Sequence, residues 1–421
     1  MKKRKSALLL AAVLTASLLT ACSPGAQEGQ EETAKSEGEA QEKTFIFGDT
    51  TFNAENGEAD INPHKDSGGW PCIRYGVGET LFRFSDTMEI EPWLATDYQN
   101  PDELTWVITL RDGVTFSNGR PMDAEAVKEC LDALTADHER AAGDLHIAQI
   151  TADGQTLTIR TEEPVPALIN YLADPYGCII DMDAGISEEG IVVGTGPYQA
   201  VSLETDARLE LVKNENYWDG EPKIDRITVR TISDGDTLTM ALQSGEIDAA
   251  YGMPYASYPL FDNDQYTFSS TATSRVFFGA MNYESEITSD PAVREAIVLG
   301  IDKESFVKTL LGGNGYPATG VYPDSFTFGG EAVREDSYDP QKAAKILEEA
   351  GWKDTDGDGV REKDGKTLTL RWLTYPSRQE LPLLAEAAQA TLGDIGFDVE
   401  INSTADQVGG QAVLGRQLGA T

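Results

Sequence analysis

The chain has 421 residues, of which 40% are hydrophobic and 25% are charged, and its formal net charge is −38. This length is enough for two or three domains with their own cores, and the composition is that of an ordinary globular protein. The acidic balance excludes nucleic acid and anionic lipid as surface partners, because both would be repelled, whereas cations would be concentrated.

The first 43 residues are predicted to carry targeting information and not a folded core. A basic segment, Lys2–Lys5, precedes an apolar run too short to cross a bilayer permanently, so we expect an export signal over residues 1–22. The ending Leu19-Thr20-Ala21-Cys22 resembles the lipobox of bacterial lipoproteins, which implies cleavage before Cys22 and lipidation of that cysteine. A plain secretory signal is the alternative. Residues 23–43 are polar and acidic, and we expect a disordered tether.

The next 130 residues alternate between strand and helix patterns. We expect strands at 44–48, 90–95, 104–111, 147–151 and 156–161. Helices are predicted at 124–134, where Asp123 can act as the N-cap, and at 167–172.

A turn, a strand and a second turn make up residues 194–220. The first turn is Gly194-Thr195-Gly196-Pro197-Tyr198, the strand alternates over 207–212, and the second turn is Asn214-Glu215-Asn216-Tyr217-Trp218-Asp219-Gly220. No Gly-Lys-Ser/Thr follows the glycines, so a phosphate-binding loop is excluded. We predict a structural corner.

The remainder again mixes strands and helices. The patterns predict a strand at 224–230, a helix at 236–244, a strand at 275–282 and a helix that starts at Pro291 with Asp290 as its cap. A helix near 340–350 and a strand-helix-strand unit over 367–401 follow. After Asn402 the chain is rich in Gly, Gln and Ala.

The two turns of 194–220 closely resemble the signature of family 5 extracellular solute-binding proteins, the peptide- and nickel-binding receptors of ABC importers. Residues 115–127 and 245–248 resemble two further family stretches. The resemblance implies an α/β, two-lobed periplasmic-binding-protein-like fold of the class II, cluster C type. We expect lobe I over 44–265, with an inserted subdomain at about 76–184, and lobe II over 266–421. Family members continue beyond residue 401, so the C-terminal part of lobe II is expected to be missing.

Two regions are candidates for ligand binding. The segment 64–75 contains His64, Trp70, Arg74 and Tyr75, and aromatic side chains beside an arginine suit a small charged ligand. An ordinary surface loop is the alternative. Arg140 lies in a stretch that resembles nickel receptors, whose arginine there contacts the carboxylates of a metal chelate; a solvated arginine after a helix end is the alternative.

Two positions depart from that nickel-receptor pattern. Some of those receptors have a second arginine near the position of Asp174 and an aromatic residue near Gly143. The departures leave the identity of the ligand open between a metal chelate and a peptide.

Other chemistry has little support. The histidines lack metal-ligand spacing, there is no nucleophile elbow, and the four cysteines (Cys22, Cys72, Cys130 and Cys178) form no Cys-x-x-Cys pair. We therefore expect no catalytic residue, resident metal or cofactor, although the sequence leaves open whether two of the last three cysteines meet. Residues 354–359 look like the start of a calcium loop, but the twelfth position is Gly365, which favours a simple acidic turn over calcium binding.

The resemblance implies a receptor that captures nickel or a metal chelate between two lobes and delivers it to an ABC permease. An oligopeptide receptor of the same family is the alternative, and an exported enzyme or adhesion module is a remote one. We expect a monomer in the cell envelope, lipid-anchored on the outer face of the cytoplasmic membrane or periplasmic.

Overall fold

The computed structural model describes residues 42–404, apart from residues 271, 272, 274, 323–335, 377 and 379. The predicted export signal, the lipidation of Cys22 and almost all of the tether lie outside these residues, as does the end of the chain from residue 405. Among the helices in the described ranges, none has the length and apolar character needed to cross a membrane.

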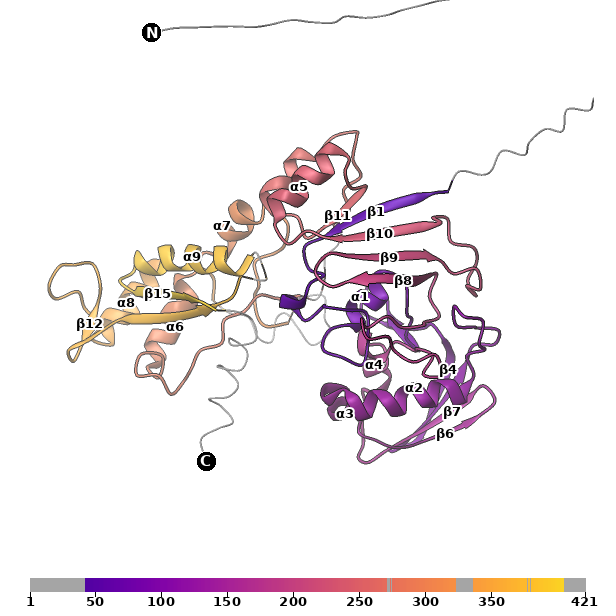
Figure 1. Ribbon diagram of the computed structural model, residues 1–421. Helices are drawn as coiled ribbons and strands as arrows, with labels where there is room; N and C mark the ends of the chain where they lie inside the picture. Colours follow the sequence, from indigo (N-terminus) through magenta and orange to yellow (C-terminus); the bar gives the residue numbers. More distant parts are fainter. Residues whose placement is uncertain are drawn as a thin grey trace, which may run out of the picture. The chain divides into compact units, whose positions relative to one another are not determined.

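A five-stranded mixed sheet has the strand order β11-β1-β10-β9-β8 (Figure 1). Its strands are β1 (Thr44–Asp49), β8 (Tyr198–Glu204), β9 (Arg208–Lys213), β10 (Arg226–Thr231) and β11 (Ala249–Tyr251). Strand β1 runs parallel to β10 and β11, and β8, β9 and β10 are antiparallel neighbours. The sheet thus joins the beginning of the described chain to segments about 180 and 200 residues later.

The helix α5 (Gly235–Ser244) packs beside β1 in this sheet. A side chain at Gly48 would put its Cβ 2.6 Å from the end of the Leu238 side chain and 2.7 Å from that of Ile247, so both side chains would have to move to admit it. Asp234 caps the helix by accepting the N–H of Thr237.

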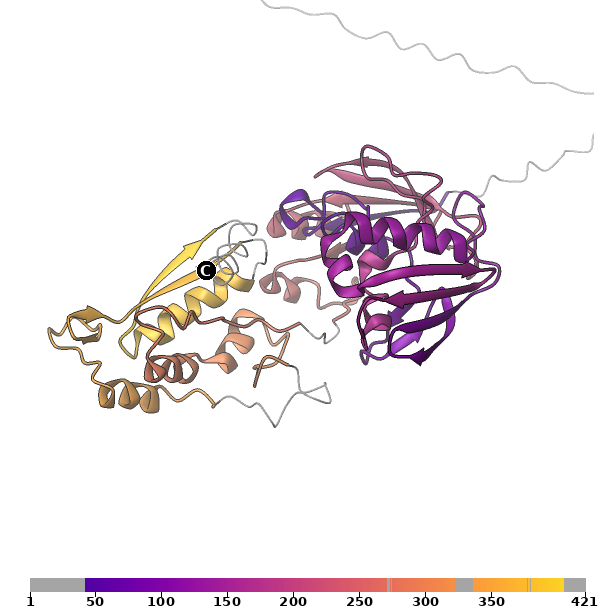
Figure 2. The same cartoon turned by 90° about the horizontal axis from the view of Figure 1, so that it is seen from below.

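A four-stranded antiparallel sheet, of order β4-β5-β7-β6, forms a second layer with α2 (Ala124–Asp137). Its strands are β4 (Ala95–Asp102), β5 (Thr105–Leu110), β6 (Ile147–Asp153) and β7 (Thr156–Thr161). In Figure 2, α2 lies against this sheet, and its Leu131 and Leu134 are fully buried. The predicted cap is confirmed, because Asp123 accepts the N–H of Ala126 at 3.0 Å.

The strand-helix-strand unit predicted over 367–401 is confirmed. Strand β14 (Thr369–Thr374) pairs in parallel with β15 (Asp398–Ser403), and α9 (Glu380–Gly393) connects them. Two further helices, α6 (Pro291–Gly300) and α8 (Pro340–Glu349), pack in the same core. Asp290 caps α6 as predicted, by accepting the N–H of Ala292.

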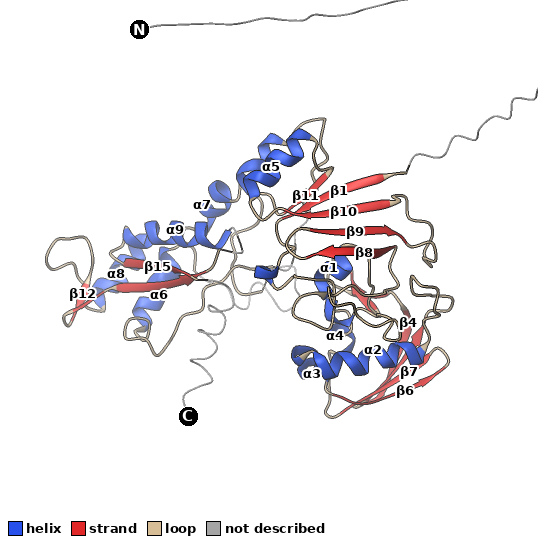
Figure 3. Cartoon of the chain, viewed as in Figure 1, coloured by secondary structure: helices blue, strands red, loops and turns tan. Residues whose placement is uncertain are grey.

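Short elements connect these layers (Figure 3). The strands are β2 (Phe82–Phe84), β3 (Ile90–Pro92), β12 (Glu362–Lys363) and β13 (Lys366–Thr367). The α-helices are α1 (Gly69–Arg74), α3 (Glu139–Leu145), α4 (Leu168–Tyr171) and α7 (Lys303–Ser305). Three 3-10 helices, η1 (Ala54–Asn56), η2 (Pro175–Gly177) and η3 (Tyr255–Leu260), and one π-helical turn, η4 (Phe306–Leu310), complete the described elements.

Two predicted strands need correction. Residues 275–282 carry no strand, and Phe278 is 70% exposed there. A strand needs a neighbour for its backbone hydrogen bonds, and no strand in the described part of the chain pairs with this segment. The strand expected at 90–95 ends at Pro92, because β3 pairs with β2, and a different pairing, with β5, begins at Ala95.

The larger buried cluster spans Phe52 to Val229, and a second one spans Val293 to Val399. These two cores fall within the ranges predicted for lobes I and II. The boundary near residue 265 and the limits of the inserted subdomain stay predictions.

Candidate ligand-binding site

The corner at residues 194–220 is organised around one buried carboxylate, that of Glu79. This side chain is 1% exposed and accepts hydrogen bonds from the Thr195 hydroxyl (2.8 Å), the Tyr217 hydroxyl (3.0 Å) and the Trp218 indole (2.9 Å). Burial raises the pKa of Glu79, although the three donors act in the opposite direction. Both turns of the corner are therefore tied to the same point in the core.

The glycines of this corner are required by close backbone contacts. A Cβ on Gly194 would lie 2.1 Å from the carbonyl oxygen of Val77, and one on Gly196 would lie 2.3 Å from that of Gly76. The carbonyl of Gly194 also accepts the N–H of Ser117 at 2.9 Å. The prediction of a structural corner is confirmed, since these groups hold parts of the protein together.

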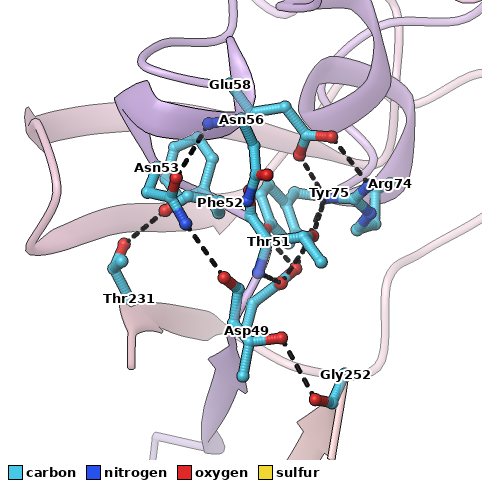
Figure 4. A network of polar contacts seen from close by, with 11 residues as sticks. Asp49, Thr51, Phe52, Asn53, Asn56, Glu58, Arg74, Tyr75, Thr231 and Gly252 are labelled. Atoms are coloured by element: carbon cyan, nitrogen blue, oxygen red, sulfur yellow. Dashed lines mark hydrogen bonds and ion pairs between the residues drawn. The ribbon is translucent and has the colours of Figure 1, made fainter. Parts of the chain in front are cut away.

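A second buried network joins the end of β1 to α1 (Figure 4). Arg74 forms ion pairs with Glu58 at 2.7 Å and with Asp49 at 3.4 Å, and Asp49 also accepts the Tyr75 hydroxyl at 2.8 Å. Thr51 donates both its N–H and its hydroxyl to Asp49. Arg74 and Tyr75, which are neighbours in the sequence, thus both contact the carboxylate of Asp49 at the end of β1.

The charges in this network are compensated internally. Burial alone would lower the pKa of Arg74, but the hydrogen bond and the negative charge of Glu58, helped by Asp49, raise it. Burial raises the pKa of Glu58, opposed by Arg74. The Arg74 side chain is 22% exposed, so part of it faces solvent. Its guanidinium already forms ion pairs with the carboxylates of Asp49 and Glu58.

Trp70 lies one helical turn before Arg74 on α1 and is 51% exposed. Tyr75, by contrast, is 7% exposed, and its ring meets those of Phe47 and Phe52 edge-on. A cavity of about 360 Å³ lies beside Arg74 and Tyr75. The other residues that line it are Phe45, Phe47, Ile73, Gly76, Pro197, Tyr198, Leu211 and Ile227.

His64 is buried in the core, at 3% exposure. Its Nε2 lies 3.6 Å from the thiol of Cys130, and its Nδ1 has no hydrogen-bond partner. Burial lowers the pKa of His64 to about 4, so the imidazole is neutral near pH 7. This position suits a packing role.

Arg140 lies at the start of α3 in a separate polar cluster. Its side chain is 55% exposed, forms an ion pair with Asp174 and lies over the ring of Tyr176 at 4.8 Å. Asp144 is 3.7 Å from the same guanidinium and accepts the Tyr176 hydroxyl. Arg140 is thus half-exposed, and two acidic residues, Asp174 and Asp144, lie beside its guanidinium.

The sequence prediction missed three of these partners: Asp49, Glu58 and Tyr176. Asp49 follows a short strand pattern, and a carboxylate at the end of a central strand is a signal that could have been used. Glu58 and Tyr176 carry no local signal, because their roles depend on contacts with Arg74 and Arg140.

The acidic segment 354–362 forms a turn, as predicted. Asp354 accepts the N–H groups of Gly357 and Gly359, and an antiparallel bridge between Lys353 and Glu362 closes the loop. Carboxylate oxygens of Asp354, Asp356, Asp358 and Glu362 lie within 4.8 Å of one another. Calcium binding there stays an untested alternative.

Comparisons with known proteins agree with this architecture. Residues 89–419 match the family described as bacterial extracellular solute-binding proteins, family 5. The nickel-binding protein NikA of Staphylococcus aureus is 30% identical over 339 residues, which is 79% of this chain and 66% of NikA. A glutathione-binding protein, GsiB of Salmonella paratyphi A, is 32% identical over 327 residues, which is 75% of this chain and 64% of GsiB. This chain therefore spans about two thirds of the length of both relatives.

A solved structure of Staphylococcus aureus NikA in complex with Ni(L-His)2 has a TM-score of 0.71 and 28% identity. The alignment covers 87% of this chain and 75% of that structure. The expected α/β, two-lobed periplasmic-binding-protein fold is confirmed by this match. The chain belongs to family 5 of the bacterial extracellular solute-binding proteins, a family of binding proteins and not of enzymes.

Proposed function

We propose that this chain is the solute-binding receptor of an ABC importer and that its ligand is nickel in complex with a small carboxylate-bearing chelator. The observation that carries the proposal is the alignment of 87% of the chain with a NikA structure that holds Ni(L-His)2. Closure of two lobes over the ligand would then signal the loaded state to the permease.

Three features of the chain itself support a metal chelate as ligand. Arg140 is held against the Tyr176 ring with 55% of its side chain exposed, so its guanidinium can donate to a ligand carboxylate from the open side. Trp70 offers an exposed aromatic face on α1. The overall charge of −38 favours the approach of a cation.

Isothermal titration calorimetry of the full chain with Ni(II) and L-histidine together tests the proposal. We expect saturable binding that Arg140→Ala weakens by roughly 1.5–3 kcal/mol, the value of a charged hydrogen bond. Arg208→Ala is the matched control, because Arg208 is 56% exposed and pairs with Glu204 at the surface. Equal losses in both variants would remove Arg140 from the site, and no heat from the wild-type chain would refute a nickel–histidine ligand.

A peptide ligand is the second candidate, favoured by the 32% identity with the glutathione-binding protein. An extended peptide would bind through backbone hydrogen bonds to an exposed strand edge. Titration with glutathione and with a mixture of dipeptides to pentapeptides distinguishes the two candidates. Tight peptide binding without a response to nickel and histidine would establish the alternative.

The proposal includes lipid attachment at Cys22, anchoring on the outer face of the cytoplasmic membrane or release into the periplasm, and a monomeric state. The lipid attachment and the location are inferred from the basic, apolar and small-residue pattern that ends at Cys22. Cys22→Ala should shift the exported protein from the membrane fraction to the soluble fraction. An unchanged membrane fraction would count against the anchor.

A further inference from the structure

Three buried cysteines lie in the core between α1, α2 and η2. Cys72 lies in α1, Cys130 in α2 and Cys178 directly after η2, and each is completely buried as a free thiol. They come from segments far apart in the sequence. The proposed ligand site uses none of them, so their proximity calls for a separate explanation.

Cys72 and Cys178 approach each other across Gly78. A Cβ built on Gly78 would lie 2.7 Å from the sulfur of Cys72 and 3.3 Å from that of Cys178. Because both distances start from one point, the two sulfurs lie within about 6 Å of each other. The backbones are close as well, since a Cβ on Gly69 of α1 would lie 2.3 Å from the carbonyl oxygen of Pro175 in η2.

Cys130 is oriented differently from this pair. Its sulfur accepts the N–H of Ile180 at 3.4 Å and lies 3.6 Å from Nε2 of His64. The Cys130 thiol donates to the backbone carbonyl oxygen of Cys178, also at 3.6 Å, and not to the Cys178 sulfur. Burial raises the pKa of the Cys130 thiol to about 12 and also raises that of the Cys178 thiol, so the direction of the Cys130 sulfur, and not its pKa, separates it from the pair.

A metal site made of these thiols and His64 does not fit the geometry. Among the described residues, the acidic loop at 354–362 is the cluster in which three or more such donor atoms lie within 4.8 Å of one another. The donor atoms of the cysteines and His64 do not come together in this way. A disulfide needs only two sulfurs close to each other, whereas a metal site needs about four ligand atoms around one point.

We propose that Cys72 and Cys178 are a disulfide pair that links α1 to η2 once the chain meets an oxidant. Two S–H bonds break and one S–S bond forms; the two electrons and two protons pass to the disulfide of a thiol–disulfide oxidoreductase or of a small disulfide, which becomes two thiols. The sulfurs must approach to about 2 Å, so the link requires both side chains to rotate about their Cα–Cβ bonds. Because both thiols are buried, the bond forms during folding.

The link would have a consequence for the candidate site. Helix α1 carries Trp70 and Arg74, whereas η2 carries Tyr176, the ring on which Arg140 lies. A covalent bond from residue 72 to residue 178 would fix these two candidate contact regions relative to each other. It would also close a long loop and so restrict the unfolded chain.

The test is to refold the full chain with oxidised and reduced glutathione, block free thiols with N-ethylmaleimide under denaturing conditions, and map tryptic peptides by mass spectrometry. We expect a linked Cys72–Cys178 peptide pair that is two hydrogens lighter than the two thiol peptides, and a labelled Cys130. Labelling of Cys72 and Cys178 in full, or a link through Cys130, would overturn the proposal.

Urea unfolding with and without dithiothreitol provides the second measurement. Reduction should lower the unfolding midpoint of the wild-type chain and of Cys130→Ser, the matched control, and leave Cys72→Ser and Cys178→Ser unaffected. Should those two variants fail to fold, a reductant response that is absent from both the wild type and Cys130→Ser would still overturn the proposal. Neither readout depends on the ligand, so a failed nickel titration would not bear on this result.

Discussion

The indole N–H of Trp218 donates to the carboxylate of Glu79, 2.9 Å away and 139 residues earlier in the chain. The hydroxyl of Thr195, from the other turn of the corner, reaches the same carboxylate oxygen at 2.8 Å. The motif at residues 194–220 therefore supplies the donors of a polar cluster, and the acceptor, Glu79, lies more than 100 residues earlier in the sequence.

Removal of this centre should destabilise the protein strongly. Glu79→Ala leaves one buried donor, Thr195, and two half-buried donors, Tyr217 and Trp218, without an acceptor, and we expect a loss of about 3 kcal/mol in the free energy of unfolding. Urea denaturation followed by circular dichroism measures it. Glu91→Ala is the control, because its side chain is 46% exposed and pairs with Arg83 at the surface, where about 1 kcal/mol or less is at stake. Similar losses in the two variants would contradict the central role of Glu79.

His64 should make the protein sensitive to moderate acid. Burial lowers the pKa of the folded imidazole from 6.5 to about 4, so the unfolded chain takes up a proton before the folded chain does. The stability contributed by the neutral imidazole is complete above pH 6.5 and is lost as the pH falls toward 4. The loss amounts to roughly 3 kcal/mol.

A comparison with His64→Gln isolates this contribution. The amide does not titrate, so the stability difference between wild type and variant should shift in favour of the variant between pH 7 and pH 4.5, whatever the packing cost at neutral pH. His146→Gln, which removes an exposed imidazole, is the control. A wild-type-to-variant difference that stays constant over this range would show that His64 does not titrate as the burial implies.

Local signals predicted the elements well where the relevant contacts are local. Asp123 and Asp290 cap α2 and α6 as expected, because an N-cap needs only its own side chain and an N–H two or three residues later. The strand expected at 275–282 failed for the opposite reason. Its run of apolar residues is compatible with a strand, but a strand exists only with a neighbouring strand, which the local sequence does not supply.

The candidate site was predictable only in part. The local composition points to Arg74 and Tyr75, but the carboxylates that bind them, Asp49 and Glu58, are two among 71 acidic residues and cannot be distinguished without the fold. A family resemblance points to Arg140. Its pairing with Asp174 follows from the packing of α3 against the start of η2.

Arg74 should prove more important for stability than for binding. Asp49 and Glu58 are 0% and 6% exposed, so Arg74→Met leaves two buried carboxylates without their cation and should cost about 3–5 kcal/mol. Adding Glu58→Gln to that variant should recover part of the loss, because one of the two charges is then gone. Arg208→Met, a surface substitution, controls for loss of an arginine. A stable Arg74→Met protein with weakened ligand binding would assign Arg74 to the ligand instead.

Asp174 should limit the affinity of the proposed site for anionic chelators. It pairs with Arg140 in a partly exposed position, at 27% and 55% exposure, so a ligand carboxylate would have to compete with it for the guanidinium. Asp174→Asn weakens the competitor and keeps its shape, and we expect up to about a fivefold tighter binding of Ni(II) with L-histidine, the value of about 1 kcal/mol for an exposed ion pair. Asp132→Asn, which breaks a surface pair with Lys128 at 2.9 Å, is the control in the same calorimetric titration. Weaker binding in Asp174→Asn would show instead that Asp174 positions Arg140 for the ligand, because a guanidinium released from its partner would then have lost the orientation that binding requires.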